Sequence, residues 1–146
     1  MKNWEKAESK VARAIHGKRV PGSGNGRLAG DITNKYLMVE MKETAQDRLT
    51  FKLAWLNKIL MEALSEHRIP VFGIEFNNGS QIFLIRQKDI SIEIVKEEDW
   101  TKKTTTAIGA NSLVEGTRIK TISGYWITVS IEEVMNLSKE CMYGEN

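Results

Sequence analysis

The stretch DITNKYLMVEMK, residues 31–42, carries the pattern that decides the fold. Tyr36 to Lys42 is rich in residues that favour β-strands, and the Thr33-Asn34-Lys35 segment before it is typical of a turn. We therefore predict a β-hairpin or a short pair of strands here. Successive side chains of a strand point to opposite faces. The residues expected on one face are Met38, Glu40 and Lys42, and those expected on the other are Leu37, Val39 and Met41.

Asp31 lies on the other arm of this predicted hairpin, opposite or diagonal to Glu40 and Lys42. Two carboxylates beside a lysine suit metal-assisted hydrolysis of a phosphodiester, because Mg²⁺ prefers hard oxygen ligands. Lys42 would orient or help to deprotonate the attacking water and would stabilise the charged transition state. The alternative is an ordinary charged strand face, with Asp31 as a turn residue, which is what a Glu-x-Lys pattern alone usually means.

An amphipathic helix is predicted from residue 4 to about residue 16, with Gly17 at its end. Glu8 falls inside the apolar stripe of this helix. A carboxylate that points toward the protein body costs desolvation energy unless it is paired or bound to a metal. Glu8 therefore either completes a metal site or pairs with a Lys or Arg on the buried side. The apolar residues of the stripe are Trp4, Ala7, Val11 and Ile15.

The segment from Pro21 to Gly30 is too rich in glycine for regular structure and is predicted to be a loop. Basic and hydroxyl side chains accompany it, so that the loop can bind a DNA phosphate through backbone amides and guanidinium groups. It could equally be a long surface hairpin loop. The residues we assign to DNA binding are Lys18, Arg19, Gly22, Ser23, Gly24 and Arg27.

Helices and strands are expected to alternate along the rest of the chain. Apolar spacing from Leu53 to Leu64 predicts a second helix. Two strands should follow, at residues 71–76 and 81–86, joined by the turn at residues 77–80. This order favours an α/β fold with a central mixed β-sheet flanked by helices.

In the C-terminal third, one segment has little periodicity in its apolar residues and the next has clear strand and helix signals. Residues 96–120 are polar and rich in threonine, so that we expect loops, at most one short strand, and a polar insertion. Tyr125 to Val129 should form a strand, and Ser130 to Glu133 is a capping box that opens a last helix. Methionines in apolar patterns are expected in the core, whereas His16 and His67 are expected at the surface or at helix ends. These methionines are Met38, Met41, Met61 and Met135.

Length and composition favour a single domain in a reducing compartment. The chain has 146 residues, of which 41% are hydrophobic, which is enough for one core. Its apolar runs are shorter than the roughly 20 residues of a membrane helix, and its start has no signal-peptide pattern. Cys141 is the single cysteine, which excludes an internal disulfide and a cysteine-based zinc site. We expect a soluble, unexported, cytoplasmic protein.

Positive charge is concentrated at the beginning of the chain. Residues 1–42 contain nine Lys or Arg and four acidic residues, so that the remainder carries a net charge of −3 although the whole chain is +2. A locally basic segment is expected of a protein that contacts phosphates. Solvated lysines on an ordinary helix give the same count about as often.

These residues together resemble a known family of nucleases. Their order along the chain resembles that in the archaeal-type Holliday junction resolvases, which are PD-(D/E)XK nucleases, and in related phage enzymes. The matching positions are Glu8, Arg19-x-x-Gly22-Ser23-Gly24, Gly30-Asp31, Glu40-Met41-Lys42 and residues 69–76, so that the resemblance covers roughly residues 4–95. Residues 125–136 resemble the last strand and helix of the family. Gly30 stands where many related nucleases carry a proline.

The resemblance implies an activity, a cofactor and a partner. It implies a homodimer that introduces paired nicks into opposing strands of four-way DNA junctions with Mg²⁺ or Mn²⁺. Asp31 and Glu40 would bind the metal with the Met41 carbonyl, Glu8 would complete the site through water, and Ser23 would contact the scissile region. A phage-encoded enzyme would act in the host cytoplasm. The alternatives are a nicking or repair endonuclease for other branched or linear DNA, and a non-catalytic DNA-binding module.

Overall fold

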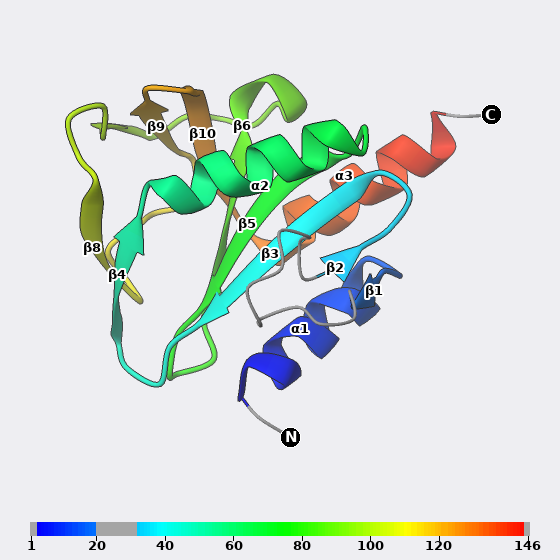
Figure 1. Ribbon diagram of the computed structural model, residues 1–146, viewed down its shortest axis with the longest axis horizontal. Coiled ribbons are helices and arrows are strands. Elements are labelled where there is room, and N and C mark those ends of the chain that lie inside the picture. Colours follow the sequence, from blue (N-terminus) through cyan, green and yellow to red (C-terminus); the bar gives the residue numbers. More distant parts are fainter. Residues whose placement is uncertain (1–2, 20–31, 145–146) are drawn as a thin grey trace.

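The structure, a computed structural model, describes residues 3–19 and 32–144, with side chains described from residue 7. Figure 1 shows its ribbon. The described helices are α1 (Asn3–Ala14), α2 (Ala54–Ser65) and α3 (Ile131–Tyr143), with the 3-10 turn η1 (Gln87–Asp89). The strands are β1 (Lys18–Arg19), β2 (Ile32–Thr33), β3 (Leu37–Glu43), β4 (Arg48–Lys52), β5 (Ile69–Glu75), β6 (Gln81–Arg86), β7 (Lys96–Asp99), β8 (Thr105–Gly109), β9 (Thr117–Thr121) and β10 (Gly124–Val129).

A mixed sheet runs through the centre of the described part of the molecule. Its strand order is β1-β2-β3-β5-β6-β10-β9-β7, and β4 pairs with β8 in a separate two-stranded sheet. The β3–β5 and β7–β9 pairs are parallel and the other pairs are antiparallel. The prediction of a mixed sheet flanked by helices is confirmed.

Helices cover both faces of this sheet (Figure 1). On one face, α1 and α3 enclose a core cluster that contains Val11 of α1, Val39 of β3 and Val134 of α3. On the other face, α2 packs with the β4–β8 pair over a second cluster, which contains Met38 and Phe72. Neighbouring residues of β3 thus belong to opposite cores, as the alternation of side chains along a strand requires.

The strand pair predicted around residues 31–42 is present. β2 pairs with β3 in antiparallel register, with Ile32 opposite Val39 and Thr33 opposite Met38. The predicted second helix and the two following strands correspond to α2, β5 and β6. Ser130 caps α3, because its hydroxyl accepts a hydrogen bond from the backbone N–H of Glu133.

The expectation of loops with at most one short strand in residues 96–120 is wrong. This segment contains β7, β8 and nearly all of β9. β9 lies between β10 and β7 in the main sheet, and β8 pairs with β4. Most side chains of β7 and β8 are not buried, so that these short strands lack the apolar alternation from which a strand is recognised. Tertiary pairing, rather than local pattern, makes them strands.

The expectation that Met61 lies in the core is also wrong. Its side chain is 69% exposed, whereas Met38 and Met41 are buried as predicted. The residues of α2 that face the sheet are Leu56, Ile59 and Ala63. Met61 is two residues from Ile59 and from Ala63, and a spacing of two residues turns a helical side chain by about 200°, away from the covered face.

Histidines occupy the left-handed position at the ends of two helices. His16, after α1, has φ 53°, and His67, after α2, has φ 58°. In each case the next residue donates a hydrogen bond across the helix end, from Gly17 N to Ala12 O and from Arg68 N to Ala63 O. The prediction that both histidines lie at the surface or at helix ends is confirmed. No helix in the described segments is long and apolar enough to cross a membrane.

Asn34 fastens the β2–β3 turn to two helices. Its amide nitrogen donates hydrogen bonds to the Ile15 carbonyl, at 3.1 Å, and to the Ser138 hydroxyl, at 2.9 Å. Its side-chain oxygen accepts from the backbone N–H groups of Tyr36 and Leu37, both at 2.8 Å. The end of α1, the turn and α3 are therefore held together by one side chain.

Replacement of Asn34 by Ala is expected to lower the free energy of unfolding by about 2–4 kcal/mol, because each lost hydrogen bond contributes on the order of 1 kcal/mol. Urea denaturation followed by circular dichroism measures this change. Asn78→Ala is the matched control, since the exposed Asn78 accepts hydrogen bonds only within its own turn. Equal effects of the two substitutions would contradict the role given to Asn34.

Candidate active site

Glu8 points into the protein, as the helical pattern predicts. It is only 2% exposed, and it lies next to Ala7, which packs in the α1–α3 core. Its carboxylate accepts a hydrogen bond from Arg19 Nε of β1 at 3.1 Å. The pairing of Glu8 with a basic side chain is therefore observed, and its part in a metal site stays a prediction. Arg19, which we assigned to DNA, is thus placed against a carboxylate.

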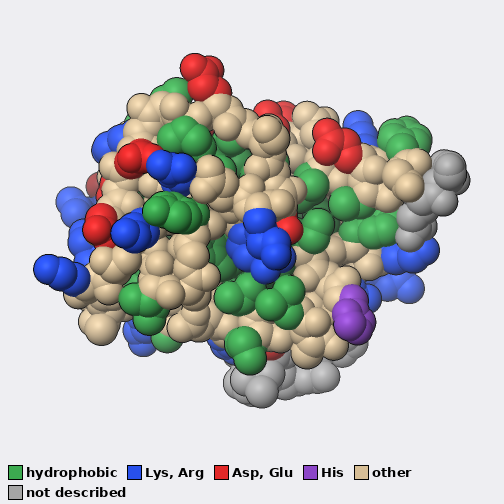
Figure 2. All heavy atoms as spheres, turned by 90° about the horizontal axis from the view of Figure 1, so that it is seen from above, with side chains coloured by type: hydrophobic (Ala, Val, Ile, Leu, Met, Phe, Trp, Pro, Cys, Tyr) green, Lys and Arg blue, Asp and Glu red, His purple; other side chains and the backbone are tan. Residues whose placement is uncertain are grey.

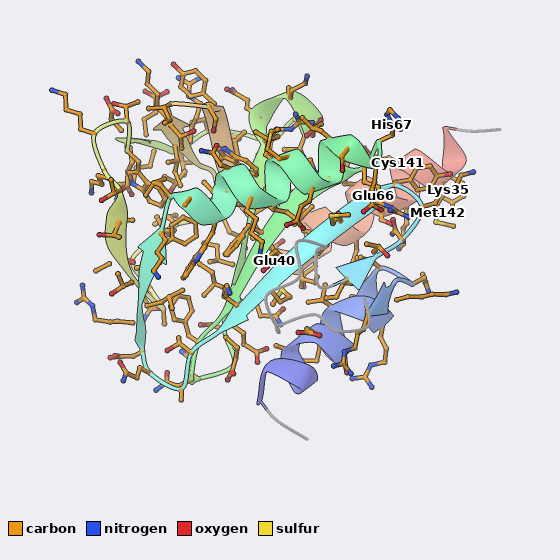
Figure 3. The ribbon with its side chains drawn as sticks, viewed as in Figure 1. Lys35, Glu40, Glu66, His67, Cys141 and Met142 are labelled. Carbon is orange, nitrogen blue, oxygen red and sulfur yellow. The ribbon has the colours of Figure 1, made fainter. Side chains whose placement is uncertain are left out.

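Glu40 is buried in the middle of β3, with 9% of its surface exposed. It shares the α2 face of the sheet with Met38 and is opposite Phe72 of β5 in the parallel register. Figure 3 labels Glu40 on β3 near the centre of the molecule. β2 pairs with β3 only at Val39 and Met38, so that no described strand pairs with Glu40 on that side. A buried carboxylate therefore lies on β3 one residue past the end of the described β2–β3 pairing.

Lys42 lies on the same face as Glu40, two residues further along β3. Its ammonium group is 5.2 Å from the ring centroid of Trp55 at the start of α2, a distance that allows a cation–π interaction. Trp55 stacks on Phe72, with centroids 5.8 Å apart, and meets Phe51 edge-on at 5.3 Å. The aromatic cluster holds the Trp55 ring, and the ring face in turn restricts the position of the ammonium.

Sequence reasoning missed Trp55 as a partner of Lys42. The two residues are thirteen positions apart, and α2 meets β3 only because it packs on the sheet. The Leu53–Leu64 pattern indicated a helix but not which strand it covers. An aromatic residue in the first turn of that helix was the available signal.

Met41 points to the opposite face from Glu40 and Lys42, and its side chain is buried in the α1–α3 core. It is opposite Gly73 of β5. A Cβ atom added at Gly73 would lie 2.4 Å from Met41 Sδ and 2.6 Å from Phe83 Cε1. Gly73 therefore provides the space for the Met41 side chain beneath the Glu40-Met41-Lys42 segment. The predicted role of the Met41 carbonyl as a metal ligand stays a prediction.

A second acidic pair, which sequence reasoning did not identify, lies on the α1 face at the end of β3. Glu43 is opposite Glu75 of β5. Glu75 accepts hydrogen bonds from Lys10 Nζ of α1, at 3.3 Å, and from Gln81 Nε2, at 2.9 Å. Burial, followed by repulsion from Glu75, raises the pKa of Glu43 above its ordinary value.

The raised pKa of Glu43 predicts how stability depends on pH. The native state binds this proton more tightly than the unfolded state, so that the contribution of Glu43 favours folding at low pH and is lost as pH rises through its native pKa. Glu43→Gln is therefore expected to be more stable than the wild type at pH 7, with a difference that shrinks near pH 4. Urea midpoints at the two pH values measure this, with the exposed Glu115→Gln as control. A Glu43→Gln protein that is less stable at pH 7 would contradict the assignment.

Several predicted site residues lie outside the described residues. They are Gly22, Ser23, Gly24, Arg27 and Asp31. Within the described segments, no three His, Cys, Asp or Glu side chains gather in an arrangement that could hold a metal ion. The predicted oxygen ligands that are described are Glu8, Glu40 and the Met41 carbonyl, and their chemistry suits Mg²⁺. Lys18, assigned to DNA binding, is exposed on β1.

Comparison with known proteins identifies the fold. No protein-family model matches the sequence, and no curated protein matches it. The structure is similar to that of Hjc from Archaeoglobus fulgidus, a Holliday junction resolvase from an archaeal hyperthermophile, with a TM-score of 0.52. The match covers 90% of this chain and 91% of the other at 13% sequence identity. The chain therefore has the mixed α/β fold of the Hjc nuclease, a central mixed sheet flanked by helices.

Proposed function

We propose that this protein is a metal-dependent DNA endonuclease that resolves four-way junctions by paired nicks. The observation that carries the proposal is the buried Glu40 on the same face of β3 as Lys42, in a chain with the fold of a Holliday junction resolvase. Burial of a carboxylate costs desolvation energy, which coordination to a metal ion can offset. Acid and lysine on one strand face are the groups that metal-assisted phosphodiester hydrolysis needs.

Asp31, Glu40 and the Met41 carbonyl would hold Mg²⁺, for which Mn²⁺ would substitute. The register of β2 and β3 supports this assignment. Ile32 pairs with Val39, and Asp31 and Glu40 are the next residues along the chain on the same side of that pair. The bound ion would neutralise charge on the phosphate oxygens and activate a water. Glu8 would complete the site through water, and its hydrogen bond with Arg19 fixes the direction of the carboxylate.

Lys42 would orient the attacking water and stabilise charge that develops on the phosphate. The Trp55 ring limits the positions of its ammonium, so that less conformational entropy is lost when the substrate binds. Trp55 is a positioning residue in this proposal, since it acts through Lys42.

The substrate would be held by the glycine-rich loop and by the chain before it. In our proposal Lys18, Arg19 and Ser23 contact the DNA backbone near the scissile bond, together with Gly22, Gly24 and Arg27. Two nicks in opposing strands require two active sites, so that the proposed functional form is a homodimer.

The test is cleavage of end-labelled four-way junction, nicked, flap and linear duplex DNA in Mg²⁺, with Lys42→Ala protein as the control for contaminating nuclease. Symmetrical paired nicks confined to the junction are expected. Cleavage of linear duplex at the same rate as the junction would support the catalytic site but contradict selectivity for junctions. Binding without cleavage of any DNA would favour a non-catalytic DNA-binding module.

A further inference from the structure

The two-stranded sheet of β4 and β8, which we call the β4–β8 ribbon, has two different faces. Residues directly opposite each other in an antiparallel pair point to the same face. The inner face buries Phe51 and Ile108 in the core cluster that α2 covers. The outer face is formed by the alternate residues, and no acidic residue is among them. In order of pairing they are Arg48 with Gly109, Thr50 with Ala107, and Lys52 with Thr105.

Cations lie on this outer face and beside it. Arg48 and Lys52 of β4 are exposed, and so are Lys102 and Lys103 in the segment that leads into β8. Residues 48–52 and 101–107 therefore hold four cations and no carboxylate, whereas the chain from residue 43 onward carries a net charge of −3. Figure 2 shows Lys and Arg side chains at the left-hand end of the molecule, where Figure 1 places β4 and β8. The ribbon thus concentrates positive charge in a part of the chain that is otherwise acidic.

The two cations of β4 are not paired with a carboxylate. In the part of the chain that the structure describes, neither Arg48 nor Lys52 forms an ion pair. Lys102 differs from them, because it lies near Asp99. Hydrogen bonds from Thr101 lower the pKa of the Asp99 carboxyl, and the charge of Lys102 contributes to the same shift. The charge of Lys102 is thus partly offset, whereas Arg48 and Lys52 present theirs to solvent.

The outer face of the ribbon is accessible and firmly held. The paired side chains between the two cations are short, a threonine and an alanine, so that a partner can approach the backbone closely. Backbone hydrogen bonds continue past both ends of the ribbon, from Leu53 N to Thr104 O at 2.9 Å and from Ala110 N to Asp47 O at 3.0 Å. The buried inner face fixes the ribbon to the rest of the molecule. A surface that is preorganised in this way loses less entropy on binding.

We propose that the outer face of the β4–β8 ribbon binds the phosphate backbone of a duplex DNA arm, with Arg48 and Lys52 on the two sides of a groove. This inference rests on the proposed function, to which it adds a contact region apart from the site of cleavage. Four residues of a strand span roughly 13 Å. The major groove is about 12 Å wide and admits a two-stranded β-ribbon. The spacing and the charge of the two side chains therefore suit phosphates that face each other across this groove.

The ribbon is close enough to the proposed active site for one arm to contact both. Lys52 is three residues before Trp55, so that at most about 11 Å of chain separates them. The Trp55 ring in turn lies 5.2 Å from the Lys42 ammonium. One turn of duplex DNA is roughly 34 Å long, which exceeds this separation.

The test is the salt dependence of DNA binding by the Arg48→Gln/Lys52→Gln protein, measured by fluorescence anisotropy in Ca²⁺ without Mg²⁺, on four-way junction and on linear duplex. Each lost phosphate contact lowers the magnitude of the slope of log K against log salt by about 0.9, so that a decrease of roughly 1.8 is expected. Lys88→Gln/Lys139→Gln is the matched control, because it removes two exposed lysines from η1 and α3 and should leave the slope unchanged. Circular dichroism verifies folding, and each single substitution on β4 should give about half of the decrease if the double variant does not fold.

The result distinguishes this inference from the proposed function. If the wild type cleaves junctions and the β4 variants keep its slope, the inference is overturned and the nuclease assignment is not affected. A reduced slope in a protein that cleaves no DNA would support the ribbon as a DNA contact and contradict the nuclease. A wild-type protein that binds no DNA, or equal slopes in the test and control variants, would overturn the inference.

Discussion

Replacement of Glu40 by Gln is expected to abolish cleavage while the protein keeps its fold and its affinity for DNA. The substitution preserves the shape of a buried side chain and removes the charge that would bind the metal. Loss of several kcal/mol of transition-state stabilisation lowers the rate on the order of 10³-fold or more. Asp31→Asn is expected to act in the same way. DNA binding should be unchanged or tighter, since one negative charge near the phosphates is lost.

Single-turnover cleavage of an end-labelled four-way junction measures the effect, with binding determined in parallel in Ca²⁺. Glu43→Gln is the matched control, because Glu43 is on the same strand as Glu40 but points to the opposite face. It should cleave at nearly the wild-type rate. Full activity of the Glu40→Gln protein would contradict the assignment of Glu40 to the active site.

Phe51→Ala is expected to lower the free energy of unfolding by about 3–5 kcal/mol, the range for truncation of a fully buried phenylalanine. Phe51 is completely buried on β4. Its ring contacts Trp55, Phe72 and Trp100, with centroid distances of 5.3, 5.3 and 5.7 Å. The substitution would leave a cavity beside Trp55, the ring that the Lys42 ammonium contacts.

Urea denaturation of Phe51→Ala and Leu49→Ala proteins measures this effect. Leu49 is on the same strand but is only partly buried, so that its truncation should cost clearly less. Junction cleavage by the Phe51→Ala protein, under conditions in which it is folded, should be slower because Trp55 holds Lys42 less firmly. Equal destabilisation by the two substitutions would contradict the central place of Phe51 in the core.

Elements with strong local patterns were predicted with nearly their observed bounds. The turn at residues 77–80 separates β5 from β6, and Ser130 caps α3, because turn and cap residues act within a few positions along the chain. Alternation along β3 likewise placed Glu40 and Lys42 on one face. Strands β7 and β8 were not predicted, since their polar sequences form strands through pairing with distant segments.

The candidate site likewise combines features that the sequence predicted with features that only the folded structure showed. Helical spacing was sufficient to predict that Glu8 faces inward, and strand alternation was sufficient to group Glu40 with Lys42. The Arg19 partner of Glu8 and the Trp55 partner of Lys42 came from the folded structure. Local periodicity depends on backbone geometry within a few residues and specifies the face of an element on which a side chain lies. What packs against that face depends on the order of strands in the sheet and on the helix that covers it, and contacts between segments distant in sequence establish both.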